Sequence, residues 1–237
     1  VIRDPHIDAV AVATPVSTHF PLAMEALQSG KHVLVEKPMT ATSEEALRLI
    51  EAADRGNLVL MVDHTFVYTG AVRKIRQLID EGALGEIYYY DSTRVNLGLF
   101  QYDVDVIWDL AVHDLAIMDY IFPESPSEIV ATGIGHVNGA AENIAYITAF
   151  HESPLIAHLN VNWLSPLKVR RTLIGGSKRM VVYDDIESSE KVKVYDRGVN
   201  VNNGPESRYT LQVSYRSGDM YATHIDTTEA LRIVAQH

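Results

Sequence analysis

Short runs of buried-type residues alternate with amphipathic segments through the first 82 residues, and this alternation limits the fold more than any other feature. Strands are predicted at Asp8–Ala13, His32–Glu36 and Leu58–Val62. Helices between and after them are predicted to end at Gly30, near Gly56 and at Gly82, the second beginning with the capping pair Thr42 and Glu45. Strand–helix alternation predicts a parallel sheet, which binds ligands at the carboxyl ends of its strands. Three turns are expected at that edge: Thr14-Pro15, Glu36-Lys37-Pro38 and Asp63-His64.

The pattern changes after Gly85. A strand at Ile87–Val95 and a long helix at Asp105–Phe122 precede a region of short β-like runs. These strands are predicted at 129–137, 143–150, 155–163, 169–174, 180–184, 192–195 and 209–215, before a helix at Thr227–Gln236. We therefore predict an α/β fold in two parts, 1–82 with a partial parallel sheet and 83–237 with a large, mostly antiparallel open sheet.

Composition excludes several classes of protein. The 237 residues contain no cysteine, which excludes disulfides, thiolate zinc sites and cysteine nucleophiles, and fits a reducing compartment. The formal net charge of −11 argues against nonspecific nucleic-acid binding. The longest apolar runs are far shorter than the ~20 residues of a membrane-spanning helix. Five cations could still meet an anionic ligand or simply be solvated: Lys168, Arg170, Arg171, Lys178 and Arg179.

Two short motifs have residue types suited to proton transfer. Glu36-Lys37-Pro38 places an amine at the predicted ligand edge, and a cis bond before the proline would direct it into the cleft, although a surface ion pair is the alternative. Asp109 and His113 stand four apart on the long helix, so the carboxylate could orient the imidazole or form an ordinary helix-surface hydrogen bond. Because Asp114 is adjacent to His113, a metal site formed by histidine and aspartate is a further possibility, but the sequence has no further metal ligands at a recognisable spacing.

The glycines at Gly133, Gly135 and Gly139 do not form a phosphate-binding motif. Such a motif must open a helix after a strand, whereas the residues that follow these glycines are predicted to form a strand. Backbone turns explain them better.

Three motifs taken together resemble one family. They are Asp8 to Pro15 followed by His19, Gly30 to Pro38 with its Glu36-Lys37-Pro38 end, and Trp108-Asp109-x-x-x-His113-Asp114. This order resembles the glucose-fructose oxidoreductase / inositol dehydrogenase (Gfo/Idh/MocA) family. Arg94-x-Asn96-Leu97-Gly98, and Trp163 to Pro166 leading into Arg170-Arg171, are most similar to its UDP-N-acetylglucosamine-type 3-dehydrogenases.

The resemblance implies an NAD- or NADP-dependent sugar dehydrogenase, with a nucleotide sugar as substrate. Residues 1–82 would be the remainder of a Rossmann-like dinucleotide-binding domain, and 83–237 a substrate-binding domain whose sheet joins copies into a dimer or tetramer. A cytoplasmic location is expected, with neither a membrane nor a nucleic acid as partner. The nicotinamide side of the cofactor would be lined by Thr14, Pro15, His19, Glu36 and Lys37.

The resemblance also assigns the substrate side. Lys37 and His113 would flank the reacting carbon, one of them accepting the hydroxyl proton while Asp109 orients His113. The remaining substrate contacts would come from Arg94, Asn96, Arg170 and Arg171, and the basic segment from Lys168 to Arg171 could contact a diphosphate.

Three alternatives remain beside this interpretation. The family's glycine-rich turn is expected before Val1, so we expect a piece of a longer enzyme, or else an inactive fragment without that turn. A ligand-sensing or regulatory protein on the same scaffold is a second alternative, although it would not need Lys37, Asp109 and His113 together. Metal-dependent hydrolysis is a third.

Overall fold

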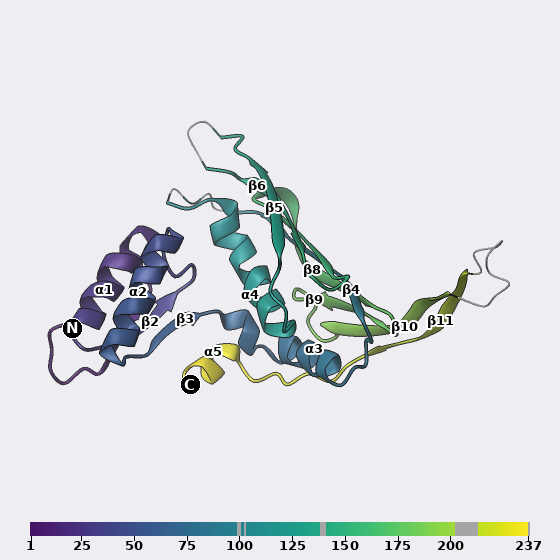
Figure 1. Cartoon of the computed structure of the whole chain (residues 1–237), viewed down its shortest axis with the longest axis horizontal. Helices are drawn as coiled ribbons and strands as arrows, with labels where there is room; N and C mark the ends of the chain where they lie inside the picture. Colours follow the sequence, from purple (N-terminus) through teal and green to yellow (C-terminus); the bar gives the residue numbers. More distant parts are fainter. Residues whose placement is uncertain (99–100, 102, 138–140, 202–212, 237) are drawn as a thin grey trace.

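The chain forms a small parallel sheet and a large mixed sheet (Figure 1). The computed structural model describes residues 1–98, 101, 103–137, 141–201 and 213–236. Gly139 and the first part of the strand predicted at 209–215 lie outside the described residues. The predicted class, a partial Rossmann-like sheet followed by an α+β part with a mostly antiparallel sheet, is confirmed.

The small sheet has the order β1-β2-β3 with all strands parallel: β1 (Ala9–Val12), β2 (His32–Glu36) and β3 (Leu60–Asp63). Glu36 is in register with Asp63, so the two strands end at the same level. The helices α1 (His19–Gln28) and α2 (Ser43–Gly56) pack against each other and against this sheet. The sheet therefore presents its carboxyl-end turns along one edge, as predicted.

The ends of α2 agree with the prediction. The Thr42 hydroxyl accepts a hydrogen bond from the Glu45 backbone N–H at 3.2 Å, which confirms the cap. At the other end the helix stops at Gly56, and Asn57 caps it in the left-handed conformation. The buried face differs from the apolar stripe that the sequence indicates, Ala46, Leu47, Ile50 and Ala53: Leu49 is fully buried, whereas Leu47 is 60% exposed.

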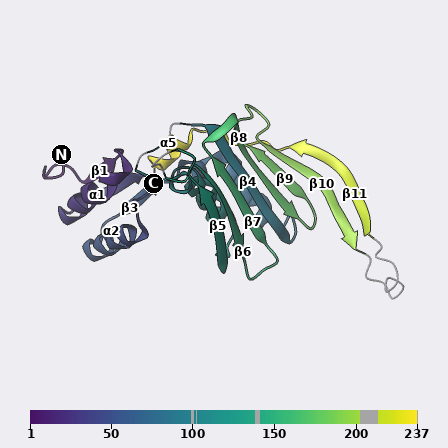
Figure 2. The ribbon, with the colours of Figure 1, turned by 90° about the horizontal axis from the view of Figure 1, so that it is seen from above.

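The large sheet has the order β11-β10-β9-β8-β4-β7-β6-β5 (Figure 2). Within this sheet, β4 and β7 form the one parallel pair among the described strands, and the other pairs are antiparallel. The strands are β4 (Ile87–Leu97), β5 (Glu128–Ile134), β6 (Ile144–Phe150), β7 (Ile156–Asn162), β8 (Leu164–Gly176), β9 (Met180–Asp184), β10 (Val192–Val201) and β11 (Val213–Ala222). Gly133 lies within β5, which agrees with the rejection of a phosphate-binding loop there.

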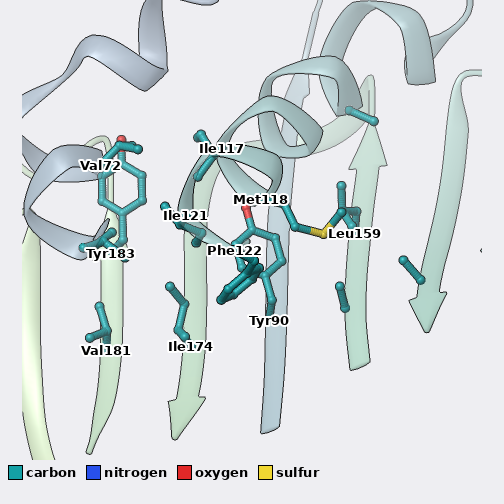
Figure 3. Close-up of a cluster of buried hydrophobic side chains, with 14 of the residues drawn as sticks. Val72, Tyr90, Ile117, Met118, Ile121, Phe122, Leu159, Ile174, Val181 and Tyr183 are labelled. Carbon is teal, nitrogen blue, oxygen red and sulfur yellow. The ribbon is translucent and has the colours of Figure 1, made fainter. Parts of the chain in front are cut away.

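Two helices cover one face of the large sheet. They are α3 (Gly70–Asp80) and α4 (Val112–Ile121), and their apolar residues share one buried cluster with the facing strands (Figure 3). Ile117 and Ile121 of α4 lie near Tyr90 and Ile174, which are opposite each other on β4 and β8. Because α3 packs in this cluster, the core of the second part includes residues that precede Gly82.

The segment before α4 is a π-helix (η3, Ile107–Ala111), continuous with α4. A π-turn holds more residues than an α-turn and is often found at functional sites. It changes the direction of Asp109 relative to His113, which the α-helical spacing did not predict. A last short helix, α5 (Ala230–Val234), contacts the 3₁₀ turn η2 (Thr65–Tyr68). Across the described residues, none of the helices has both the length and the apolar character needed to cross a bilayer.

Candidate active site

A cavity of about 350 Å³ lies at the carboxyl ends of β1 and β2. The two turns that the sequence predicted at this edge form one side of it, with Thr14 and Pro15 from the first and Glu36 and Lys37 from the second. The Lys37–Pro38 peptide bond is cis, as proposed. Val104 and Asp109 from the second part of the chain form the opposite side. The lining combines apolar residues such as Val16 and Val104 with polar ones such as Glu36 and Lys37.

His19 connects the two turns through its side chain. Its side chain is buried, with Nδ1 2.9 Å from the carbonyl oxygen of Pro38 and Nε2 2.8 Å from that of Thr14. Both ring nitrogens are therefore used by the backbone. His19 supports the two turns and also lines the cavity, so it has a positioning role, and its predicted contact with the cofactor stays a prediction.

Lys37 reaches across the cavity to Asp109. Its amine donates to the Asp109 carbonyl oxygen at 2.8 Å and to the carboxylate oxygen Oδ1 at 3.0 Å. The other carboxylate oxygen, Oδ2, accepts a hydrogen bond from the indole N–H of Trp163 at 3.0 Å. Trp163 is buried between β7 and β8. The carboxylate is thus held on both sides, which fixes the position of the lysine amine.

His113 does not receive the contact that the sequence predicted. The Asp109 carboxylate is used by Lys37 and Trp163, and the buried Nδ1 of His113 has no hydrogen-bond partner among the described residues. The expectation that Asp109 orients His113 is therefore wrong, and the physical reason is the π-helical turn that contains Asp109. The His113 ring instead packs edge-on against Phe66 of η2, with ring centroids 4.9 Å apart.

The surroundings of His113 keep its ring neutral. Burial and the positive charges of Arg94, Lys37 and Arg170, with a smaller contribution from His64, lower its pKa to about 2. The pKa of His64, at the end of β3, is also lowered by burial, an effect that Asp63 and Asp119 oppose and Lys37 reinforces. Lys37 acts on both histidines, so the three residues share one electrostatic environment.

Asp114 is part of a buried ion pair and not of a metal site. Its carboxylate accepts from Arg94 Nε at 2.7 Å and Nη2 at 3.1 Å, and from the Ser92 hydroxyl at 2.9 Å. Both partners of the ion pair are almost fully buried. These contacts occupy the oxygens that a metal ion would need. Arg94 also lies over the Phe66 ring, 4.6 Å from its centroid.

Strand alternation separates the two predicted arginines of β8. Arg170 lies on the helix-covered face, 5.7 Å from the Phe66 centroid, and contacts Asp185 at 3.2 Å. Arg171 lies on the opposite face and contacts Asp184 at 3.0 Å. The two arginines cannot both contact one substrate near His113. The prediction that Arg171 contacts the substrate is therefore corrected. Asn96 lies two residues after Arg94 on β4, next to an irregularity in the register with β8, and its contact with substrate stays a prediction.

Sequence reasoning missed Trp163 and Phe66 as site residues. Neither side chain carries a charge, and the partners of each come from distant elements. A larger cavity of about 610 Å³ lies between the start of α3, the β9–β10 connection and residues 223–228. It contains Asp185 but neither Lys37 nor Asp109, which both line the smaller cavity, so we assign the active site to the smaller cavity.

Two family models match this chain. Residues 1–64 match the oxidoreductase family with an NAD-binding Rossmann fold, and residues 72–182 match the GFO/IDH/MocA C-terminal domain. UDP-N-acetylglucosamine 3-dehydrogenase of Acidithiobacillus ferrooxidans is 30% identical over 235 residues, which cover 98% of this chain and 71% of that protein. The chain belongs to the GFO/IDH/MocA family. The model that matches its first part describes an NAD-binding Rossmann fold.

Solved structures of GFO/IDH/MocA relatives agree with this assignment. The crystal structure of the same A. ferrooxidans dehydrogenase has a TM-score of 0.76 at 27% identity, covering 97% of this chain and 67% of that one. The WlbA dehydrogenase of Bordetella pertussis, in complex with NADH and UDP-GlcNAcA, has a TM-score of 0.71 at 21% identity, covering 77% and 57%. The second similarity shows the fold alone.

Proposed function

We propose that this protein is a dehydrogenase that oxidises a CH–OH group of a sugar with NAD or NADP. The observation that carries the proposal is the Lys37 amine, held by Asp109 at the cavity where the strands end, within the electrostatic range of a neutral His113. The A. ferrooxidans relative acts on a UDP-sugar, and the WlbA structure contains one. Both support a nucleotide sugar as the substrate class.

The residues of this site can handle the proton of the reaction. Lys37 would donate a hydrogen bond to the reacting oxygen and stabilise negative charge on it. His113 is neutral near neutral pH, so one of its ring nitrogens has a lone pair that can accept the hydroxyl proton. Thr14, Pro15 and Glu36 would hold the nicotinamide ring beside the same carbon. When bound, that ring supplies the hydride acceptor.

Hydride transfer with the Lys37→Ala variant tests the proposal. We expect NADH formation from UDP-N-acetylglucosamine or a related sugar to fall by about 100-fold or more, the usual range for loss of a proton-transfer group. Lys74→Ala is the control, since Lys74 is a surface lysine of α3 that contacts Gln77. Equal rates for the wild type and Lys37→Ala would refute the role of the lysine.

Wider features of the predicted enzyme belong to the same proposal. The cofactor-binding part, residues 1–82, and the substrate-binding part, residues 83–237, would meet at the site. Because α3 packs in the core of the large sheet, the β3–α3 connection is a better boundary between the two folding units than residue 82. Exposed apolar side chains on the outer face of β5, β6 and β7 support a homo-oligomer. A reaction that uses NAD and nucleotide sugars would take place in the cytoplasm.

A further inference from the structure

Two arginines lie directly opposite each other on the inner face of the large sheet. Arg94 on β4 is in register with Arg170 on β8, and both guanidinium groups contact the ring of Phe66. Like charges in directly opposed positions destabilise a sheet. Each arginine has its own aspartate, Asp114 for Arg94 and Asp185 for Arg170. The aspartates reduce the repulsion between the two strands.

The aspartates leave hydrogen-bond donors of both guanidinium groups unused. Nη1 of Arg94 is buried and has no partner in the described part of the chain, although the Arg94 side chain is only 4% exposed. Within the same part, Arg170 hydrogen-bonds through Nη1 alone, and its side chain is 34% exposed. A buried charged donor without an acceptor is costly, and such groups are normally paired. The pair therefore has unused donors for a further acceptor with negative charge.

We infer that Arg94 and Arg170 form a subsite for an oxyanion of the substrate, beside His113 and Phe66. The ligand is a sugar with a carboxylate on its ring or a phosphate attached to it, since guanidinium groups bind both through the same oxygen geometry. The inference rests on the proposed sugar dehydrogenase and names the charge of its substrate. Arg171 has no part in the subsite, because it lies on the other face with Asp184.

An anion bound in the subsite would change the pKa of His113. Besides burial, the charges of Arg94, Lys37, Arg170 and His64 lower the pKa of its ring. An oxyanion between the arginines offsets two of these positive charges, so the pKa of His113 rises when substrate binds. The imidazole then becomes a stronger proton acceptor in the complex than in the free protein. The negative charge of the substrate and the basicity of His113 are therefore coupled through the same two arginines.

Tryptophan fluorescence can measure this binding without any nicotinamide. The chain has two tryptophans: Trp163 contacts Asp109, and Trp108 precedes Asp109 in the π-helix. The purified protein is titrated at constant ionic strength with glucuronate, inorganic phosphate, UDP-N-acetylglucosamine and neutral N-acetylglucosamine. The test variant is Arg170→Gln. Arg171→Gln is the matched control, one residue away on the same strand and also paired with an aspartate.

We expect Arg170→Gln to weaken binding of the anionic ligands by at least about tenfold, as for loss of a charge-assisted hydrogen bond, and Arg171→Gln to change it less than twofold. Binding of glucuronate but not phosphate would identify a ring carboxylate, and the reverse a phosphate. Equal affinity for neutral N-acetylglucosamine, equal losses in both variants, or no loss in Arg170→Gln would overturn the subsite.

Two further measurements separate binding from folding and from the reaction. Arg170→Lys retains the charge and should recover part of the affinity, which a merely misfolded Arg170→Gln could not explain. The ¹H–¹⁵N signals of His113 should report a higher pKa in the presence of the bound anion, and an unchanged pKa would contradict the inference. Because both experiments omit NAD, a failure of hydride transfer would refute the proposed function without altering these results.

Discussion

At the scale of single residues, the position of Asp109 depends on one uncharged side chain. The indole N–H of Trp163 occupies Oδ2 and leaves Oδ1 for the Lys37 amine. Without that N–H the carboxylate loses a fixed partner and can rotate away from the lysine. Trp163 is therefore a positioning residue for Lys37, acting from the β7–β8 connection.

We expect Trp163→Phe to lower kcat about tenfold with little change in KM, because the aromatic ring is retained and only one hydrogen bond to a charged group is lost. Steady-state kinetics over a range of pH would measure this. Trp108→Phe, which alters the other tryptophan, is the control and should retain kcat. Equal losses in both variants would indicate a general packing effect and contradict the positioning role.

His113 also predicts how stability depends on pH. Its pKa is about 2 in the folded chain against an ordinary value of 6.5, so between these values the unfolded chain binds more protons. The contribution to stability is fully present above pH 6.5 and is lost as the pH falls below it, by at most about 1.4 kcal/mol per pH unit. The urea midpoint of His113→Gln should therefore decrease less between pH 7 and pH 4 than that of the wild type. The exposed His6 provides the control, and a His6→Gln variant that gives the same relief would refute this explanation.

Residue types and spacing predicted that Lys37, Asp109 and His113 share one site; Lys37 and Asp109 line one cavity, and the charge of Lys37 acts on His113. Residue types and spacing were not sufficient to predict which groups bond. The Asp109–His113 contact rested on α-helical geometry, and the π-turn changes that geometry. Trp163 and Phe66 contact the site through tertiary packing, for which a single sequence contains no local signal.

At the scale of elements, helix α3 depends on a close approach at its first residue. A methyl group added at Gly70 would overlap the carbonyl oxygen of Asp226, a backbone atom in the segment before α5. Helix propensity alone would favour alanine over glycine. Packing opposes it, because the backbone of the C-terminal segment would have to move.

Gly70→Ala should lower the free energy of unfolding by about 1–3 kcal/mol, as overpacking usually does. Hydrogen exchange should show lost protection in residues 223–228. Gly133→Ala is the control, since its added methyl group would meet mainly the flexible side chain of Glu142. A stabilised Gly70→Ala variant would show that propensity dominates at this position.

The strands and helices could be predicted because hydrophobic periodicity and turn residues are local properties of the sequence. The order β11-β10-β9-β8-β4-β7-β6-β5 could not, since it depends on which distant strands pair. The face of α2 was also predicted wrongly, with Leu47 exposed and Leu49 buried. Several apolar residues on one helix allow more than one stripe, and only packing against the sheet selects one of them.

At the scale of the whole molecule, the large sheet has helices on one face and exposed apolar groups on the other. Val130, Tyr146, Phe150 and Ile156 lie on the outer face at 39–56% exposure, and strand register places Phe150 opposite Ile156. A contiguous apolar surface of this kind is typical of a protein interface. We expect copies of the chain to associate through it.

Val130→Lys should shift the oligomer toward monomer in light scattering coupled to size exclusion, because it places a charge on the outer face. Ile129→Lys provides a matched control: Ile129 is the preceding residue of β5, similarly exposed at 59%, but points to the opposite face. Dissociation by Ile129→Lys alone, or by neither variant, would exclude this face as the interface.

The position of β4 in the middle of the large sheet has a consequence for folding during synthesis on the ribosome. Arg94 leaves the ribosome long before Val161 and Arg170, its neighbours on β7 and β8. A strand without partners is prone to aggregate, and pairing over long sequence separations is slow. Nascent chains stalled before residue 156 should therefore bind chaperones, and release from them should coincide with synthesis of β8.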